Sequence, residues 1–208
     1  MKQVYIHGLG QRPASWEKTL LHIKEANQRV CPDLAEIVHG EEVNYKNLYQ
    51  VFSDLCNEID GSIDLCGLSL GGVMALNYAI DYPEKVNSLV LIAAQYKMPK
   101  KLLQFQNVLF RFMPKSMFQQ IGFEKNDFIH LCKSMMELDF SNDLQSISCP
   151  VLVIYGEKDT ANKKASMELA ELLKNAEIKV VEGAGHEVNV DAPEQLAVIL
   201  NDFYNQVS

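Results

Sequence analysis

The stretch "DLCGLSLGGVMALNYA", residues 64–79, places one serine, Ser69, among three glycines. The short apolar run "IDLC" at 63–66 predicts a strand, and the residues after Ser69 have the apolar spacing of a helix. A G-x-S-x-G motif in that strand, turn and helix context is typical of a nucleophile elbow, which exposes a serine hydroxyl above a sheet. The flanking glycines remove side chains that so tight a turn would press against neighbouring backbone.

A serine before a helix is more commonly a plain N-cap, so a catalytic interpretation needs partners elsewhere in the chain. Asp159 follows the apolar run at 151–155, and His186 follows the weaker run at 178–181. Each would lie in a loop beyond the carboxyl end of a strand, in the chain order Ser, Asp, His. Glu157, two residues before Asp159, is the alternative acid.

Four other histidines compete with His186 for the role of base. His22 lies in a predicted helix, His39 in a loop and His130 in the inserted segment 96–145, so all three are expected to be surface or packing residues. His7 is expected to have a structural role beside the first predicted strand. These assignments leave His186 as the candidate base.

Short apolar runs alternate with segments of helical period, and this alternation predicts an α/β fold with a parallel sheet and helices on both faces. A length of 208 residues fits a single domain, 1–208. The predicted strands are 3–6, 29–32, 63–66, 86–94, 151–155 and 178–181. The predicted helices follow Ser15 as an N-cap, include 48–55 and 70–80, and cover 163–174 and 192–205.

Residues 96–145 interrupt the alternation and contain no convincing strand, so we expect an inserted helical cap there. The segment holds seven of the nine phenylalanines and five of the eight methionines. These side chains either pack the cap onto the sheet or line an acyl pocket, and the sequence does not choose between the two. The candidate pocket residues are Phe105, Phe110, Met113 and Met117.

Composition excludes several classes of function. A net charge of −8 without a basic cluster argues against nucleic-acid binding. Five cysteines, odd in number and without C-x-x-C pairs, are expected to be reduced thiols. The sequence contains no signal-peptide pattern and no apolar run of membrane-spanning length, so we expect a cytoplasmic protein. The oligomeric state is not indicated.

Four separated motifs together resemble the α/β-hydrolase superfamily of serine esterases and lipases. They are "HGLG" at 7–10, "GLSLGG" at 67–72, "YGEKD" at 155–159 and "GAGH" at 183–186. The resemblance covers nearly the whole chain except residues 96–145. It implies a short form of the fold, with about six strands, without the family's usual first two strands, and with a small cap over a partly open site.

The resemblance also implies roles for individual residues. Ser69 would be the nucleophile, His186 the base and Asp159 the residue that orients it. The backbone amides of Leu9 and Leu70 would form the oxyanion hole. No metal or other cofactor is implied.

The reaction implied by the resemblance is hydrolysis of a small or medium carboxylic ester through an acyl-enzyme. The same triad also serves thioester hydrolysis, acyl transfer and C–C bond cleavage in this superfamily. A ligand-binding or signalling protein with slow turnover is a further alternative. The expected partner is a small-molecule ester or acyl substrate.

Overall fold

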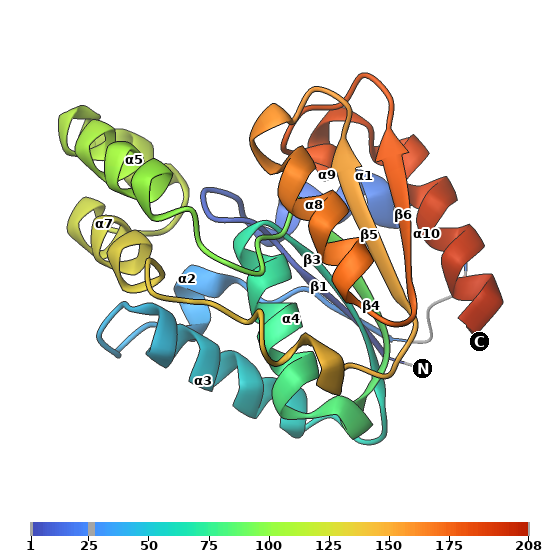
Figure 1. Cartoon of the computed structure of the whole chain (residues 1–208). Coiled ribbons are helices and arrows are strands. Elements are labelled where there is room, and N and C mark those ends of the chain that lie inside the picture. The colour runs from blue at the N-terminus through green and yellow to red at the C-terminus, as the bar shows by residue number, and fades with distance from the viewer. Residues whose placement is uncertain (1, 25–27, 208) are drawn as a thin grey trace.

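The computed structural model describes residues 2–24 and 28–207, apart from the side chains of residues 101, 102, 105, 119 and 120. Within these residues six strands form one fully parallel sheet in the order β2-β1-β3-β4-β5-β6 (Figure 1). The strands are β1 Lys2–Ile6, β2 Gln28–Val30, β3 Ile63–Leu68, β4 Val86–Ile92, β5 Val151–Gly156 and β6 Ala176–Val181. The predicted α/β fold with about six parallel strands is confirmed.

Helices cover both faces of the sheet, as Figure 1 shows. The longer helices are α3 Tyr45–Asn57, α4 Leu70–Asp81, α5 Lys100–Phe112, α7 Lys125–Ser134, α8 Thr160–Leu172 and α10 Pro193–Val207. The shorter ones are α1 Glu17–Leu20, α2 Leu34–Ile37, α6 Lys115–Gln120 and α9 Val188–Asp191, with 3-10 helices η1 Pro13–Trp16, η2 Pro83–Lys85 and η3 Leu144–Ser146.

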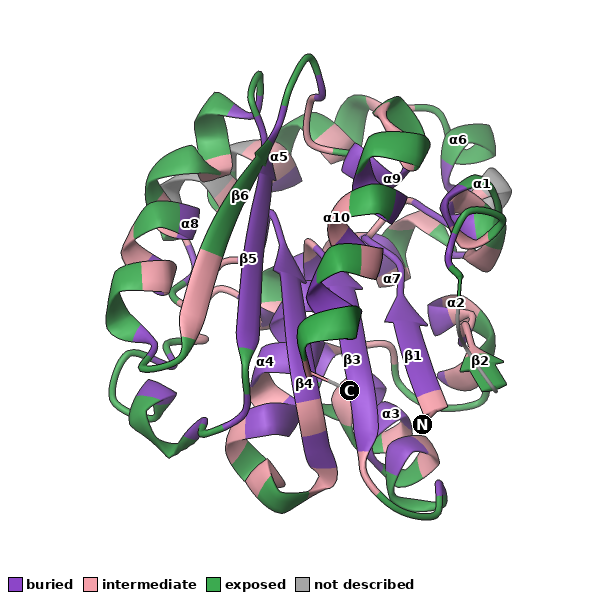
Figure 2. Ribbon diagram, turned by 90° about the vertical axis from the view of Figure 1, so that its right-hand side faces the viewer, coloured by how far each residue is buried: buried purple, intermediate pink, exposed green. Residues whose placement is uncertain are grey.

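The core is divided in two by the sheet because successive strand residues point to opposite faces. In β1, Val4 and Ile6 face the cluster formed with α3, α4 and α8. Tyr5 between them faces the second cluster, formed with α9 and α10. The four central strands are buried along most of their length (Figure 2). Burial on both faces explains their nearly continuous apolar sequences.

The two edge strands differ from the central ones. At one edge β2 has only three residues, and its Gln28 and Arg29 are exposed. At the other edge Ile178 and Val180 of β6 are exposed and alternate with the charged residues Glu177 and Lys179. Short length and charged side chains both discourage pairing with a second sheet.

The prediction of the first helix, after Ser15, was wrong in its start and its length. Ser15 is not an N-cap, because it lies inside the 3-10 helix that Pro13 begins, and α1 then extends only from Glu17 to Leu20. The apolar stripe expected on this helix is also broken. Trp16 is fully buried, whereas Leu21 is 80% exposed.

Between β4 and β5 lies the segment that we call the cap, residues 96–145, which includes α5, α6 and α7. Its two ends run side by side, because Met98 N–H donates to the Leu138 carbonyl (3.0 Å) and Phe140 N–H donates to the Tyr96 carbonyl (2.8 Å). Inside the cap, aromatic rings pack edge to face around Phe128. Much of the phenylalanine content therefore packs the cap internally.

Within residues 2–24 and 28–207, no helix combines the length and the apolar content needed to cross a membrane.

Gly156, the last residue of β5, lies in close backbone contact with the loop that follows β6. A Cβ atom on Gly156 would lie 2.0 Å from the Gly185 carbonyl oxygen, and both groups are backbone. We expect Gly156→Ala to lower the free energy of unfolding by about 3 kcal/mol, because neither chain can move aside without disturbing its strand. Urea unfolding measures the loss.

Gly61→Ala is the matched control. Gly61 has φ +79°, and a Cβ atom added there would meet nothing within 4 Å, so only backbone strain is introduced. That strain costs about 1 kcal/mol. A loss for Gly156→Ala no larger than the loss for Gly61→Ala would contradict the close approach.

Candidate active site

Ser69 occupies the turn between β3 and α4. Its φ of 53° and ψ of −114° are unusual for a residue with a side chain, so the predicted sharp, strained turn is present. The turn is held by the Ser69 N–H, which donates to the Ile92 carbonyl (2.8 Å). The Ser69 side chain makes no capping hydrogen bond to α4. The structure therefore does not support the plain N-cap interpretation.

The glycines around Ser69 allow three segments of backbone to meet. A Cβ atom on Gly67 would lie 2.2 Å from the Gly71 carbonyl oxygen, and one on Gly71 would lie 2.3 Å from the Ile6 carbonyl oxygen. On Gly72 it would lie 2.7 Å from the Ala94 Cβ atom. Gly67 and Gly71 thus permit the turn, and Gly72 permits close packing of α4 against the chain that follows β4.

His186 and Asp159 come together from the loops after β6 and β5. His186 Nδ1 lies 2.8 Å from Asp159 Oδ2, and the Asp159 side chain is 4% exposed. An Nδ1–H that donates to the carboxylate leaves Nε2 as the ring nitrogen available to another group. Among the described residues, the Ser69 hydroxyl makes no hydrogen bond to this imidazole, although both side chains line one pocket.

Asn162, which the sequence analysis did not single out, completes the surroundings of Asp159. Its Nδ2 donates to both carboxylate oxygens at 2.9 Å and lies 3.1 Å from His186 Nδ1. The amide is oriented by Gln95, whose Nε2 donates to Asn162 Oδ1 (2.6 Å). The signal for Asn162 in the sequence is its position three residues after the acid, in the first turn of α8, where an Asp N-cap accepts hydrogen bonds.

Two opposing effects determine the ionisation of Asp159. Burial alone would raise the pKa of this carboxyl group. The hydrogen bonds from His186 and Asn162 outweigh burial, and the pKa lies below its ordinary value. Asp159 is therefore ionised at neutral pH and is suited to holding an imidazole that becomes positively charged.

Glu157, the alternative acid, lies in the same loop but has a different partner. Its Oε2 accepts a hydrogen bond from the Gly183 N–H (2.9 Å). Its own backbone N–H donates to the Val181 carbonyl (3.0 Å). Glu157 therefore connects the loop that carries Asp159 to the loop that carries His186.

The other histidines lie away from this group. His7 is buried, its Nδ1 donates to the Gly8 carbonyl (2.9 Å), and its Nε2 accepts from the Leu34 N–H (3.1 Å). Burial lowers the pKa of His7, consistent with a neutral structural residue. His22 and His130 lie 4.0 Å and 3.7 Å from surface glutamates, and His39 is exposed.

Leu9, in the loop after β1, and Leu70, the first residue of α4, both border the pocket. Leu9 lies in a turn that closes with a hydrogen bond from Gln11 N–H to the Gly8 carbonyl (3.1 Å), and Gly10 supplies the required positive φ of 92°. The turn is anchored by a buried amide pair, in which Gln11 Nε2 donates to Asn189 Oδ1 (3.1 Å). Asn189 lies three residues after His186, so this pair connects the Leu9 turn to the histidine loop.

The pocket beside Ser69 has a volume of about 270 Å³. Its polar lining residues include Ser69, Asp159, Asn162, His186 and Gln95, and most of the other lining residues are apolar. The apolar wall is formed by Leu9, Leu70, Val73, Ala93, Met98, Pro99, Leu103, Phe110, Cys132, Met135 and Ala161, and Gln106 adds a second amide.

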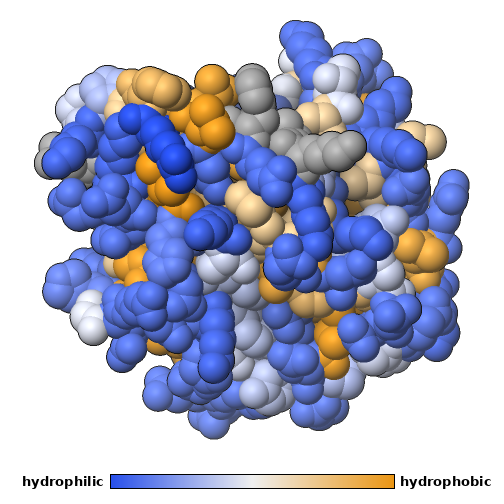
Figure 3. All heavy atoms as spheres, turned by 60° about the vertical axis from the view of Figure 1, so that its left-hand side comes forward, coloured by the Kyte–Doolittle hydropathy of each residue, from blue (hydrophilic) through white to orange (hydrophobic). Residues whose placement is uncertain are grey.

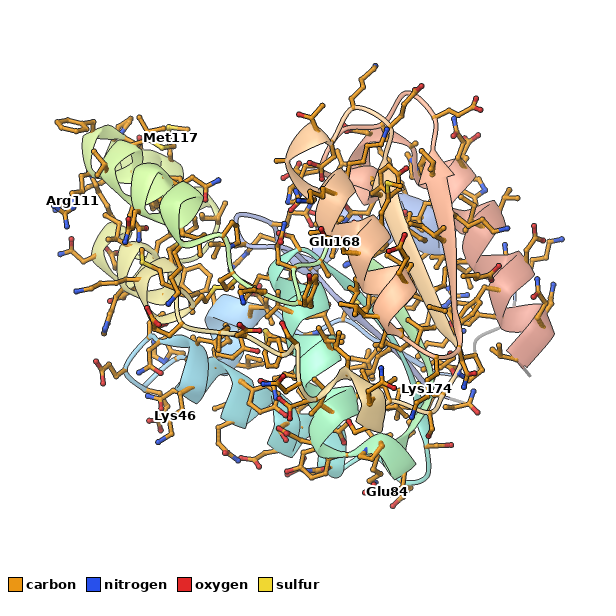
Figure 4. The ribbon with its side chains drawn as sticks, viewed as in Figure 1. Lys46, Glu84, Arg111, Met117, Glu168 and Lys174 are labelled. Carbon is orange, nitrogen blue, oxygen red and sulfur yellow. The ribbon has the colours of Figure 1, made fainter. Side chains whose placement is uncertain are left out.

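Of the four cap residues predicted for this pocket, the structure places one in it. Phe110 lines the pocket. Met113 packs against the main core cluster instead, and Met117 is 48% exposed and points away from the sheet (Figure 4). The side chain of Phe105 lies outside the described residues. Sequence alone could not specify which side of each cap helix faces the pocket.

The comparison with family models gives one match that covers most of the chain. The model described as "Alpha/beta hydrolase family" matches residues 3–199. The chain belongs to the α/β-hydrolase family. The strand, turn and helix at Ser69 are therefore those of a hydrolase of this family.

Three relatives of this hydrolase show how widely the family varies. The biotin biosynthesis bifunctional protein BioHC of Teredinibacter turnerae is 23% identical, over 98% of this chain and 44% of its own length, so this chain spans less than half of it. A putative 2-succinyl-6-hydroxy-2,4-cyclohexadiene-1-carboxylate synthase of Bacillus subtilis is 24% identical, over 98% of this chain and 90% of its own length. A Bacillus subtilis carboxylesterase is 28% identical, over 77% of this chain and 71% of its own length.

A solved structure gives the same fold. The enol-lactonase from Burkholderia xenovorans LB400 superposes on the hydrolase with a TM-score of 0.85, covers 98% of this chain and 91% of its own, and is 17% identical.

The amide of Asn162 should make the stability of this hydrolase depend on pH. Because the pKa of Asp159 in the folded protein lies below its value in the unfolded chain, about 3.9, the ionised carboxylate stabilises the fold above that pH. That contribution is lost as the pH falls through the folded-state pKa. Asn162→Ala should therefore cost about 2 kcal/mol of unfolding free energy at pH 6, and the difference from wild type should shrink below pH 4. Denaturant unfolding across this range measures it.

Asn175→Ala is the control for this effect, because Asn175 Nδ2 donates to the Ser148 carbonyl (2.8 Å) and to no carboxylate. The loss of unfolding free energy caused by Asn175→Ala should not change with pH. If the difference between Asn162→Ala and wild type is also constant from pH 6 to pH 3, the link to Asp159 is wrong.

Proposed function

We propose that this α/β-hydrolase is a serine hydrolase that cleaves small to medium carboxylic esters through an acyl-enzyme. The observation that carries the proposal is the 2.8 Å contact between His186 Nδ1 and Asp159 Oδ2 in a pocket that also contains Ser69. A serine on a strained turn becomes a useful nucleophile when such a pair can accept its proton. The carboxylesterase among its relatives supports the same class of reaction.

In the proposed reaction Ser69 Oγ bonds to the ester carbonyl carbon while its proton passes to His186 Nε2. The backbone amides of Leu9 and Leu70 donate to the oxyanion, and such a donor contributes about 3 kcal/mol. When the tetrahedral intermediate collapses, the bond between its central carbon and the alkoxy oxygen breaks. The alkoxy group takes the proton from His186 and leaves as the alcohol. Water then attacks the acyl carbon while one of its protons passes to His186 Nε2. The bond between Ser69 Oγ and the acyl carbon breaks, Oγ takes the proton back from His186, and the acid leaves.

Asp159 and Asn162 support this cycle without touching the substrate carbonyl. Asp159 holds the Nδ1–H tautomer of His186 and stabilises the imidazolium that forms. The two hydrogen bonds from Asn162 fix the carboxylate in place and keep it ionised.

The size and lining of the pocket support the substrate class. At about 270 Å³ the pocket lies just under the roughly 300–1,000 Å³ typical of sites for drug-sized ligands. Its apolar wall suits a short or medium acyl chain, whereas Gln95 and Gln106 offer amides to a polar group on the substrate. No protein group in the proposed cycle requires a metal or other cofactor.

Three alternatives remain within the same site. The first is thioester hydrolysis or acyl transfer, and the second is C–C bond cleavage, both of which the fold permits. The third is ligand binding with slow turnover. A product assay over short nitrophenyl esters, acyl thioesters and diketones distinguishes them, because rapid turnover of the esters contradicts the third and activity confined to diketones contradicts the esterase proposal.

We also infer a cytoplasmic location, which the free cysteines support, because thiols stay reduced in the cytosol. All five cysteines are free, and the pKa of the Cys31, Cys56, Cys132 and Cys149 thiols is raised by burial to between about 11 and about 12. Such thiols are protonated and poorly reactive.

Ser69→Ala should abolish the reaction. We expect kcat on a nitrophenyl ester to fall about 10⁴-fold to 10⁶-fold, because the nucleophile is removed while the pocket remains. An active-site phosphonate probe should label wild type and leave Ser69→Ala unlabelled. His130→Ala, which removes an exposed histidine 3.7 Å from Glu42, is the control and should keep full activity. Equal labelling of wild type and Ser69→Ala would refute the assignment of the nucleophile.

Substitutions at Cys132 should change acyl-chain preference. Cys132 is a buried pocket residue from α7, so Cys132→Phe should fill part of the pocket and Cys132→Ala should enlarge it. We expect the octanoate-to-acetate ratio of kcat/KM to fall about tenfold in the first variant and to rise in the second. Met117→Phe, at an exposed site, should leave the ratio unchanged. Parallel shifts in both Cys132 variants would argue against this pocket as the acyl site.

A further inference from the structure

The outer surface of the cap carries apolar side chains that nothing in the described structure covers. Phe112 is 84% exposed, Val108 51%, Met117 48% and Leu109 47%. Val108, Leu109 and Phe112 are neighbours on α5, since residues three and four apart lie on one side of a helix. We call these four residues the cap tip. Figure 3 shows hydrophobic side chains exposed among hydrophilic ones on this side of the molecule.

The charge around the cap tip is opposite to that of the rest of the protein. Residues 100–123 contain four Lys and Arg and no Asp or Glu, in a chain whose net charge is −8. Lys100 is paired with Glu137 at 2.5 Å, but Arg111 and Lys115 are exposed and form no ion pair with any described residue. Figure 4 shows Arg111 of α5 and Met117 of α6 on the part of the cap that lies away from the sheet.

We propose that the cap tip docks on the surface of an anionic lipid bilayer. An exposed aromatic and aliphatic cluster beside unpaired cations matches a surface with negative headgroups above acyl chains. A stable protein interface buries about 800 Å² per partner and involves some 20–30 residues. Four protruding side chains and two cations are few for such an interface. A fluid bilayer needs no complementary pocket and accommodates protruding side chains.

The geometry of α5 relates docking to the pocket. Leu103, Gln106 and Phe110 of this helix line the pocket, while Val108 and Phe112 lie on its outer side. A docked cap would therefore place one helix between the lipid surface and the pocket. The cap tip itself contributes no pocket residue, so docking can be tested independently of the proposed esterase activity.

The test is co-sedimentation of the full chain with vesicles. Wild type should bind vesicles of phosphatidylcholine mixed with phosphatidylglycerol, bind vesicles of phosphatidylcholine alone more weakly, and lose its preference at high salt. Phe112→Ser should lower the partition coefficient about tenfold, because a large apolar side chain is lost. Arg111→Glu combined with Lys115→Glu should lower it about a hundredfold on the anionic vesicles.

Matched controls use exposed residues that do not belong to the cap. Leu21→Ser removes an apolar side chain that is 80% exposed beside α1, and Lys18→Glu combined with Lys46→Glu makes the same change of charge on α1 and α3. These variants should bind as wild type does. Hydrolysis of a soluble ester and thermal unfolding should be unchanged in every variant, which separates docking from failure to fold.

Three results would overturn the proposal. The first is no binding of wild type to anionic vesicles, as expected if the cap tip meets an acidic protein instead. The second is an equal loss of binding in the cap variants and the control variants. The third is a dimer in sedimentation velocity that Phe112→Ser dissociates while wild type ignores vesicles, which would make a second copy the partner.

Discussion

Close contact of backbone with backbone at the end of β3 is the constraint on which the site depends. Gly71 in the first turn of α4 lies against the Ile6 carbonyl of β1, where a Cβ atom would come within 2.3 Å. This approach fixes the start of α4 against two strands at once and holds the positive φ of Ser69. The turn that contains Leu9 follows β1 directly, so the same contact places Leu9 and Leu70 on one pocket.

The loops after β5 and β6 are rigid for a different reason, because each is hydrogen bonded to the other. Lys158 N–H donates to the Ala184 carbonyl (2.9 Å), and the Glu157 carboxylate accepts from the Gly183 N–H (2.9 Å). These two hydrogen bonds thus fix the position of the loop that carries Asp159 relative to the loop that carries His186. Glu157, which the sequence offered as the alternative acid, instead helps to hold these two loops together.

Much of the fold followed from local pattern, because strands buried on both faces leave continuous apolar runs and a glycine-flanked serine marks a tight turn. Features that depend on three-dimensional contacts could not be predicted. Asn162 is one residue among several polar ones in α8, and only the position of Asp159 and Gln95 gives it a partner. Met117 was predicted to line the pocket because it is apolar, as Phe110 is, but it lies on an exposed side of the cap. Ser15 failed as a cap because Pro13 begins a 3-10 turn first.

The contact between Gln95 and Asn162 determines where the cap can be separated from the rest of the domain. Gln95 is the last residue before the cap. Its side-chain amide donates to Asn162, and the Asn162 amide in turn donates to the Asp159 carboxylate. The cap is thus a continuous segment of sequence, but the residue that precedes it helps to orient Asp159. A chimaera that exchanges the cap for that of another family member must keep its first junction after Gln95, or the exchange will disturb the orientation of the Asp159 carboxylate.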